Sequence, residues 1–159
     1  MGDVAARAGF VVDHDRCADV LAQLFGDDAC AGVGRATGGK ANPAMLNELR
    51  IVEIGEGQAV QVAGLMLGAL GAQVLKVERP GGDPSRGKAT FANWNRGKRS
   101  LELDLATPAG LAELDRRLAG ADVLLHQFTP SRAKALGLDD AALAARFPRL
   151  VTSGITGSP

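Results

Sequence analysis

The chain has 159 residues, and its 18 Lys and Arg balance 18 Asp and Glu, so its formal net charge is zero. This length suits one domain, and the charge balance excludes a polybasic nucleic-acid binder and an acidic tail. Glycine is abundant at 21 residues, whereas tyrosine is absent and only one tryptophan and five phenylalanines occur. We therefore expect an aliphatic core and a backbone that turns tightly at several points.

The two cysteines, Cys17 and Cys30, form no metal-binding pattern and are expected to be inert thiols of a cytoplasmic protein. Residues 1–10 lack the apolar run of a secretory signal. The most apolar stretch, residues 59–70, is interrupted by polar and glycine residues and is shorter than the roughly 20 residues of a membrane span. The sequence thus predicts a protein that contacts neither membrane nor nucleic acid.

Residues 1–48 differ from the remainder and receive no functional assignment. Asp15 can cap a short amphipathic helix, and residues 26–43 have the Gly- and Ala-rich composition of a linker. Residues 49–159 instead alternate short aliphatic runs with helical patterns, which indicates a separate folded domain over that range.

In chain order, that domain is expected to contain a strand at 50–54, a helix at 59–70 ended by Gly71, and a strand at 72–77. Residues 80–98 have loop composition, and a strand follows at 100–105. Thr107 and Pro108 then begin a helix that ends at Gly120, before a strand at 122–125. Short helices at 131–136 and 140–147, the second capped by Asp139, precede a strand at 150–153. This alternation predicts a Rossmann-like α/β domain with a mainly parallel sheet and helices on both faces.

The first strand–helix–strand unit has part of a dinucleotide-binding pattern. Gly55 and Gly57 follow the first strand, and Glu78 lies about 20 positions later, where such a fold places its ribose-binding acid. Val60 stands at the third glycine position, and Arg79 directly follows the acid. An NAD-type Rossmann oxidoreductase therefore stays an alternative to a Rossmann-like unit that binds no NAD.

Cations are concentrated just after this unit. In a chain of zero net charge they form a local excess that suits a small polyanion, because arginine can clamp phosphate oxygens with two hydrogen bonds. A solvated basic loop is the alternative, which composition alone would favour. The cations are Arg79, Arg86, Lys88, Arg96, Lys98 and Arg99.

Several motifs, in order and in register, make residues 49–159 similar to the family III CoA-transferases. This CaiB/BaiF group contains formyl-CoA and carnitine CoA-transferases and the α-methylacyl-CoA racemases. The resemblance implies a truncated N-terminal part of the Rossmann-like CoA-binding domain, with CoA, an acyl-CoA and a carboxylic acid as its substrates. The motifs are VERPGGD at 77–83, NRGKRSLELD at 95–104, TPAG at 107–110, ADVL at 121–124 and PRLVTSG at 148–154.

The same resemblance implies a set of CoA-binding residues, most of them at strand ends. Gln58 lies in the turn near the thioester, Arg79 meets the nucleotide end of CoA, and Leu103 lines the site. Departures from the family occur after the fourth of the expected strands, where His126 replaces an acid and Ala135 stands in place of an arginine. The full set is Gln58, Ala59, Arg79, Leu103, Gln127, Phe128, Lys134 and Leu136.

The family's nucleophile is an aspartate that attacks the acyl-CoA thioester, and the resemblance places it beyond Pro159. No other aspartate is offered in its place; those considered were Asp83, Asp104, Asp122 and Asp139. The chain is therefore expected to be a fragment or a divergent half of an enzyme, inactive alone and paired as a homodimer or with its remaining half. The acyl-CoA racemase branch and a non-catalytic interaction domain are further alternatives.

Overall fold

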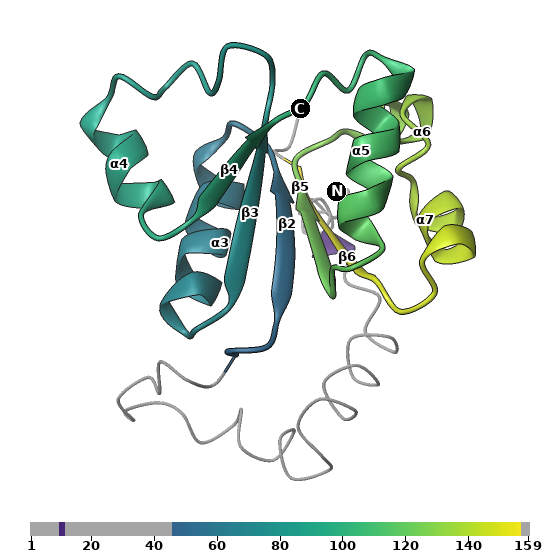
Figure 1. The fold of residues 1–159 in the computed structure, drawn as a ribbon, viewed down its shortest axis with the longest axis horizontal. Helices are drawn as coiled ribbons and strands as arrows, with labels where there is room; N and C mark the ends of the chain where they lie inside the picture. Colours follow the sequence, from purple (N-terminus) through teal and green to yellow (C-terminus); the bar gives the residue numbers. More distant parts are fainter. Residues whose placement is uncertain (1–9, 12–45, 157–159) are drawn as a thin grey trace, which may run out of the picture.

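The structure, a computed structural model, describes residues 10–11 and 46–156 (Figure 1). The helix expected after Asp15, the linker at 26–43 and both cysteines lie outside the described residues. No helix in the described part of the chain is long and apolar enough to cross a membrane.

A sheet with the strand order β1-β6-β5-β2-β3-β4 forms the centre of the molecule. Five of its strands run parallel, and β1 (Phe10–Val11), which the sequence did not predict, pairs antiparallel with β6 at one edge. The chain passes from β2 to β3 and β4 on one side and then returns to β5 and β6 on the other. This arrangement confirms the expected Rossmann-like α/β fold. The parallel strands are β2 (Arg50–Ile54), β3 (Gln73–Glu78), β4 (Arg99–Glu102), β5 (Val123–His126) and β6 (Val151–Ile155).

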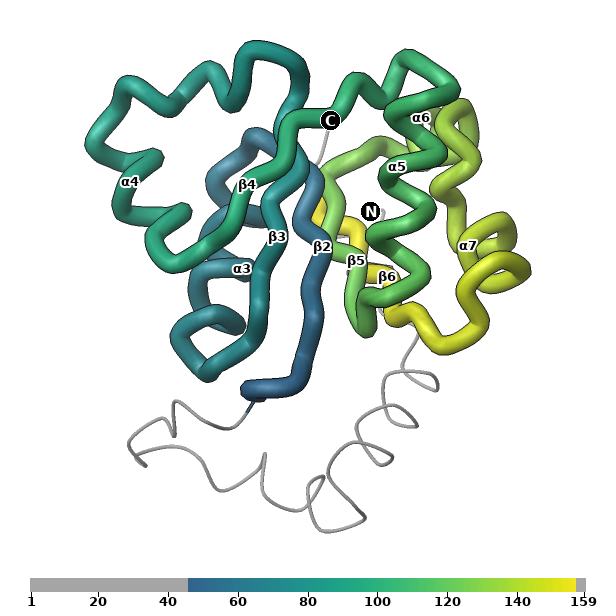
Figure 2. The backbone as a smooth tube through the Cα atoms, in the orientation of Figure 1, coloured from purple at the N-terminus to yellow at the C-terminus, as the bar shows by residue number. Residues whose placement is uncertain are grey.

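Helices lie on both faces of the sheet, as expected. Figure 2 shows α3 (Gln58–Ala69) and α4 (Ala89–Asn95) together on one side. The other side carries α5 (Pro108–Leu118), α6 (Pro130–Ala135) and α7 (Asp140–Arg146). The helix α3 therefore contacts β2, β3 and β5 from one face. On the other face, leucines of α5 and α7 share a buried cluster with residues of β2, β3 and β5.

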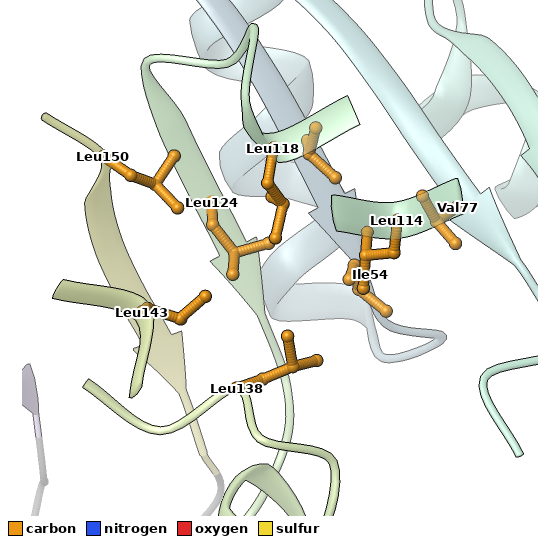
Figure 3. Packing of buried hydrophobic residues seen from close by; sticks show 9 residues of the cluster. Ile54, Val77, Leu114, Leu118, Leu124, Leu138, Leu143 and Leu150 are labelled. Atoms are coloured by element: carbon orange, nitrogen blue, oxygen red, sulfur yellow. The ribbon is translucent and has the colours of Figure 1, made fainter. Parts of the chain in front are cut away.

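Two aliphatic clusters hold these layers together, one on each face. On the face that carries α5, Leu114 and Leu118 pack against strand residues such as Ile54 and Leu124 (Figure 3). On the face that carries α3, Val60 of that helix packs against Ile51, Val74 and Leu125. Burial of a side chain of this size contributes about 1.5–3 kcal/mol, so the core forms without the aromatic residues that the composition lacks.

Local signals at the helix ends act as expected. The Oγ1 of Thr107 accepts a hydrogen bond from the Gly110 N–H at 3.1 Å, and Asp139 accepts one from the Ala142 N–H at 3.3 Å. Gly71 has a φ of +107°, a left-handed conformation in which glycine avoids the strain that a side chain would cause.

Two expectations between residues 80 and 105 were wrong. The segment 80–98 contains α4, a seven-residue helix in which the Asn95 amide donates to Gln61 of α3 at 2.7 Å. A contact distant in sequence thus supports a helix too short to form by local propensity. The strand expected at 100–105 ends at Glu102, because Asp104 accepts the Ala106 N–H and starts a turn.

Candidate functional site

A cleft of about 380 Å³ opens where the carboxyl ends of the parallel strands meet. Strand order reverses between β2 and β5, and α/β folds bind their ligands at such a reversal. The cleft therefore occupies the position at which the fold alone predicts a ligand. Its walls come from the end of β2 and the turn after it (54–56), the end of β3 and the loop after it (76–79 and Asp83), residues 103–106 after β4, Gln127 and Phe128 after β5, and Arg132 of α6.

The structure brings half of the residues implied by the family resemblance into this cleft. Those that line it are Arg79, Leu103, Gln127 and Phe128. The remaining residues, Gln58, Ala59, Lys134 and Leu136, are not among its lining residues. Gln58 and Ala59 are exposed in the first turn of α3, and Lys134 and Leu136 lie at the end of α6.

Arg132 lines the cleft, and the sequence interpretation missed it in favour of Lys134. Both cations belong to one six-residue helix, so its orientation decides which of them faces the cleft. Ala133 anchors that helix because it is buried to 5% exposure. A helical wheel of this segment could have shown that Arg132 and Lys134 lie on different sides of the helix. It would have shown which of them faces the cleft only if the burial of Ala133 had been known.

The side chain of Gln127 covers the glycine turn after β2. Its Oε1 accepts a hydrogen bond from the Gly57 N–H at 2.7 Å, at the start of α3. A Cβ at Gly55 would lie 2.7 Å from Val60 and 2.9 Å from the Cβ of Gln127, so the close approach requires glycine. A dinucleotide-binding fold seats pyrophosphate at this helix start. Here the amide of Gln127 occupies that place, which argues against the NAD alternative.

The carboxylate of Glu78 is also occupied by hydrogen bonds from other residues of the chain. Its Oε2 accepts hydrogen bonds from the Asp83 N–H at 2.8 Å and from Arg86 Nε at 2.7 Å, and its Oε1 accepts one from Arg86 at 2.9 Å. The hydrogen bond to Glu78 is the main cause that raises the pKa of Arg86 above its usual value. The acid that a NAD enzyme would use for ribose thus holds the loop after β3.

The basic segment 79–99 does not form a single anion site, which was one of the two alternatives that the sequence left open. Arg86 binds Glu78, and Lys98 is buried against Glu53 at 2.7 Å. Arg99 lines a different cleft, at the opposite end of the strands. Arg79 is the cation of this segment that lines the ligand cleft, and its Nε lies 3.1 Å from the Glu56 carboxylate.

A buried group of charges lies beneath one wall of the cleft. Lys76 of β3 places its Nζ 3.6 Å from Glu53, 3.2 Å from Asp83 and 2.8 Å from the Gly55 carbonyl oxygen. Lys98 Nζ donates to both oxygens of Glu53, at 2.9 and 2.7 Å, and to the Gln61 carbonyl at 2.7 Å. These contacts therefore join β2, β3, α3 and the residue before β4. We name Glu53, Lys76, Asp83 and Lys98 the ion cluster.

Burial and pairing act against each other within the ion cluster. Burial raises the pKa of Glu53, and hydrogen bonds and charges of Lys98 and Lys76 reduce that rise. Burial likewise lowers the pKa of Lys98, against the opposing effect of Glu53. For Asp83, burial favours the neutral form, but hydrogen bonds from Ser85 and the charge of Lys76 hold its pKa below the usual value. The sequence analysis missed the cluster, although Glu53 and Lys76 stand out in otherwise apolar strands.

His126 takes a structural position beside the cleft. It is 7% exposed, its Nδ1 accepts the Phe128 N–H at 3.2 Å, and its ring stacks on Phe128 with centroids 5.5 Å apart. Burial lowers the pKa of His126, with a nearby Asp140 acting in the opposite direction. The neutral imidazole thereby fixes Phe128, which lines both the ligand cleft and a smaller neighbouring cavity.

Comparison with models of known protein families matches residues 46–158 to CoA-transferase family III. The chain belongs to this family. The match includes every residue that lines the cleft. It also agrees with the resemblance on which the expected CoA-binding residues rest.

Relatives within family III are similar over about 70% of the chain. A probable fatty acyl-CoA transferase of Mycobacterium tuberculosis is 35% identical over 128 residues, which cover 73% of this chain and 32% of that protein. A succinate–glutarate CoA-transferase of Agrobacterium fabrum is 36% identical over 128 residues, which cover 70% and 32%. The chain thus spans about a third of the length of these relatives.

Solved structures of family III support the fold. A CAIB/BAIF family protein from Brucella suis superimposes with a TM-score of 0.63 at 34% identity, over 67% of this chain and 32% of that one. A crystal structure of the Mycobacterium tuberculosis relative gives a TM-score of 0.64 at 37% identity, over 67% and 30%. The family III fold is therefore present here as a partial region.

Proposed function

We propose that the cleft binds CoA and acyl-CoA, and that this chain supplies the CoA-binding region of an enzyme that transfers CoA from an acyl-CoA to a carboxylic acid. The family III match over residues 46–158 carries this proposal, because the match contains all the walls of the cleft. The named activities of the relatives, which include transfers between dicarboxylic acids, support the same reaction class.

The chemistry of the cleft suits the two ends of CoA. Its nucleotide end carries phosphates, which Arg79 at the rim can bind through two parallel hydrogen bonds. The pantetheine arm is neutral and flexible, and apolar walls from Ile54, Leu103 and Phe128 suit its burial. The amide of Gln127 lies at the start of α3, where its oxygen accepts the Gly57 N–H.

We expect this chain to bind CoA without transferring it, because the aspartates in the cleft and the others considered have structural tasks. Asp83 accepts hydrogen bonds from Ser85 and pairs with Lys76. Asp104 closes the turn after β4 by accepting the Ala106 N–H. Asp122 accepts the Arg50 N–H, and Asp139 caps α7. A carboxylate held this way is a poor nucleophile, so we propose that the reacting aspartate is supplied from outside residues 46–156.

Calorimetric titration of the 159-residue chain with CoA and with NADH tests the proposal. We expect saturable binding of CoA and none of NADH. Arg79→Ala should weaken CoA binding about 10- to 100-fold, since a hydrogen bond to a charged group is worth about 1.5–3 kcal/mol. Arg99→Ala is the matched control, because Arg99 lines the opposite cleft, and it should bind CoA as the unchanged chain does. The proposal would be refuted if the chain bound NADH and did not bind CoA.

A further inference from the structure

The cleft contains three cations in different states of pairing. Lys76 is buried and bound to Asp83 and the Gly55 carbonyl oxygen. Arg79 is paired with Glu56 at 3.1 Å. Arg132 is exposed, and its guanidinium makes no hydrogen bond or ion pair with any residue in the described ranges 10–11 and 46–156. Among the three cations, Arg132 is thus the one whose charge is not paired within the described part of the chain.

The carboxylates that line the cleft do not compensate for this charge. Glu78 is held by Arg86, and Asp83 by Lys76. Glu56 faces Arg79, and Asp104 accepts the Ala106 N–H at 3.0 Å. An anion that enters the cleft would therefore meet Arg132 without first displacing an internal partner.

The position of Arg132 is fixed by its helix. Thr129 caps α6 by accepting the Arg132 N–H at 3.4 Å, and the buried Ala133 holds the next residue against the core. The α6 helix follows β5, whereas Arg79 follows β3, and these two strands flank β2 on opposite sides. Arg132 and Arg79 consequently face the cleft from opposite walls.

We propose that Arg132 is a CoA-binding residue that holds a phosphate group of the nucleotide end from the wall opposite Arg79. This inference rests on the proposed function. The planar guanidinium can donate two parallel hydrogen bonds to phosphate oxygens, which a lysine ammonium cannot do. Arg79 must leave Glu56 to bind phosphate, but Arg132 is ready to bind in the ligand-free protein.

The test compares Arg132→Ala with Arg99→Ala, a cation that lines the cleft at the opposite end of the strands. Titrations use CoA and pantetheine, which has no phosphate. We expect Arg132→Ala to weaken CoA binding at least tenfold and Arg99→Ala to change it less than twofold. Neither variant should change pantetheine binding. Arg132→Lys should bind CoA more tightly than Arg132→Ala does, because lysine keeps the positive charge. It should bind CoA less tightly than the unchanged chain does, because an ammonium group cannot donate two parallel hydrogen bonds.

The outcomes separate this inference from the proposed function. If the unchanged chain binds CoA and Arg132→Ala binds it equally well, the role of Arg132 is refuted and the proposed function stands. An equal loss of CoA and pantetheine affinity would also refute it, because the residue would then act on the shape of the cleft. If the unchanged chain binds neither compound, the proposed function fails and this inference fails with it. Thermal unfolding followed by circular dichroism verifies that each variant is folded.

Discussion

Replacing Gly64 by alanine should destabilise the fold, because Gly64 is where α3 approaches the ion cluster. An added Cβ would overlap the Oε2 of Glu53, and it would lie 3.1 Å from the Cδ of that residue and 3.2 Å from Lys98 Nζ. Glu53 is completely buried between Lys98 and Lys76, so its carboxylate has no route to solvent. The new methyl group would force apart the buried carboxylate and the ammonium group of Lys98.

The magnitude follows from two opposing contributions. Loss of one partner from a buried ion pair costs about 3–5 kcal/mol. Alanine is a better helix former than glycine by about 1 kcal/mol. The expected net loss of unfolding free energy is therefore about 2–4 kcal/mol, a large part of the roughly 5–15 kcal/mol by which domains are stable.

Urea unfolding, followed by the fluorescence of Trp94 and by circular dichroism, measures this loss. Gly68→Ala is the matched control on the same helix, because its Cβ would meet Val74 at an ordinary contact distance of 3.7 Å. We expect Gly68→Ala to be unchanged or slightly more stable. A Gly64→Ala variant as stable as Gly68→Ala would refute the reasoning, since the ion cluster would then tolerate displacement.

Two further predictions concern buried titratable groups. Lys98→Met should lower the unfolding free energy by about 3–5 kcal/mol, because Glu53 loses two hydrogen bonds. In the double variant with Gly64→Ala, the losses measured by urea unfolding should be smaller than their sum, and additive losses would contradict a shared cause. Because burial lowers the pKa of His126 in the folded chain, stability should fall as pH drops below 6.5, where the unfolded state takes up the proton first. Protonation also removes the acceptor for the Phe128 N–H. The melting temperature of His126→Asn should depend less on pH below 6.5 than that of the unchanged chain. An equal dependence in both proteins would exclude His126 as the cause of the loss of stability.

Local chemistry explains why much of the fold could be predicted from the sequence. The strand at 50–54 was predicted with the bounds it has, and the cap at Thr107 and the glycine at Gly71 act through neighbouring residues. Such features depend on a few consecutive positions. The short helix α4 was missed because its support comes from Gln61, far away in the chain.

The site was less predictable for the same physical reason. Arg79 and Gln127 were named from the family resemblance, and both line the cleft because they follow strands whose carboxyl ends meet at one edge. Whether Arg132 or Lys134 faces the cleft depends on the orientation of α6, which packing decides. The ion cluster joins residues up to 45 positions apart, such as Glu53 and Lys98, and no local pattern encodes such a pairing.

The pairing of β1 with β6 also determines which backbone groups are left for intermolecular contacts. An edge strand offers unpaired amide and carbonyl groups, and exposed edges promote aggregation. At one edge of the sheet, Phe10 and Val11 pair with Ile155 and Gly154. At the other end, β4 is only four residues long and exposes the charged side chains of Arg99 and Glu102. A protein shortened to begin at β2 would lose the cover on β6 and acquire an edge through which two copies could join.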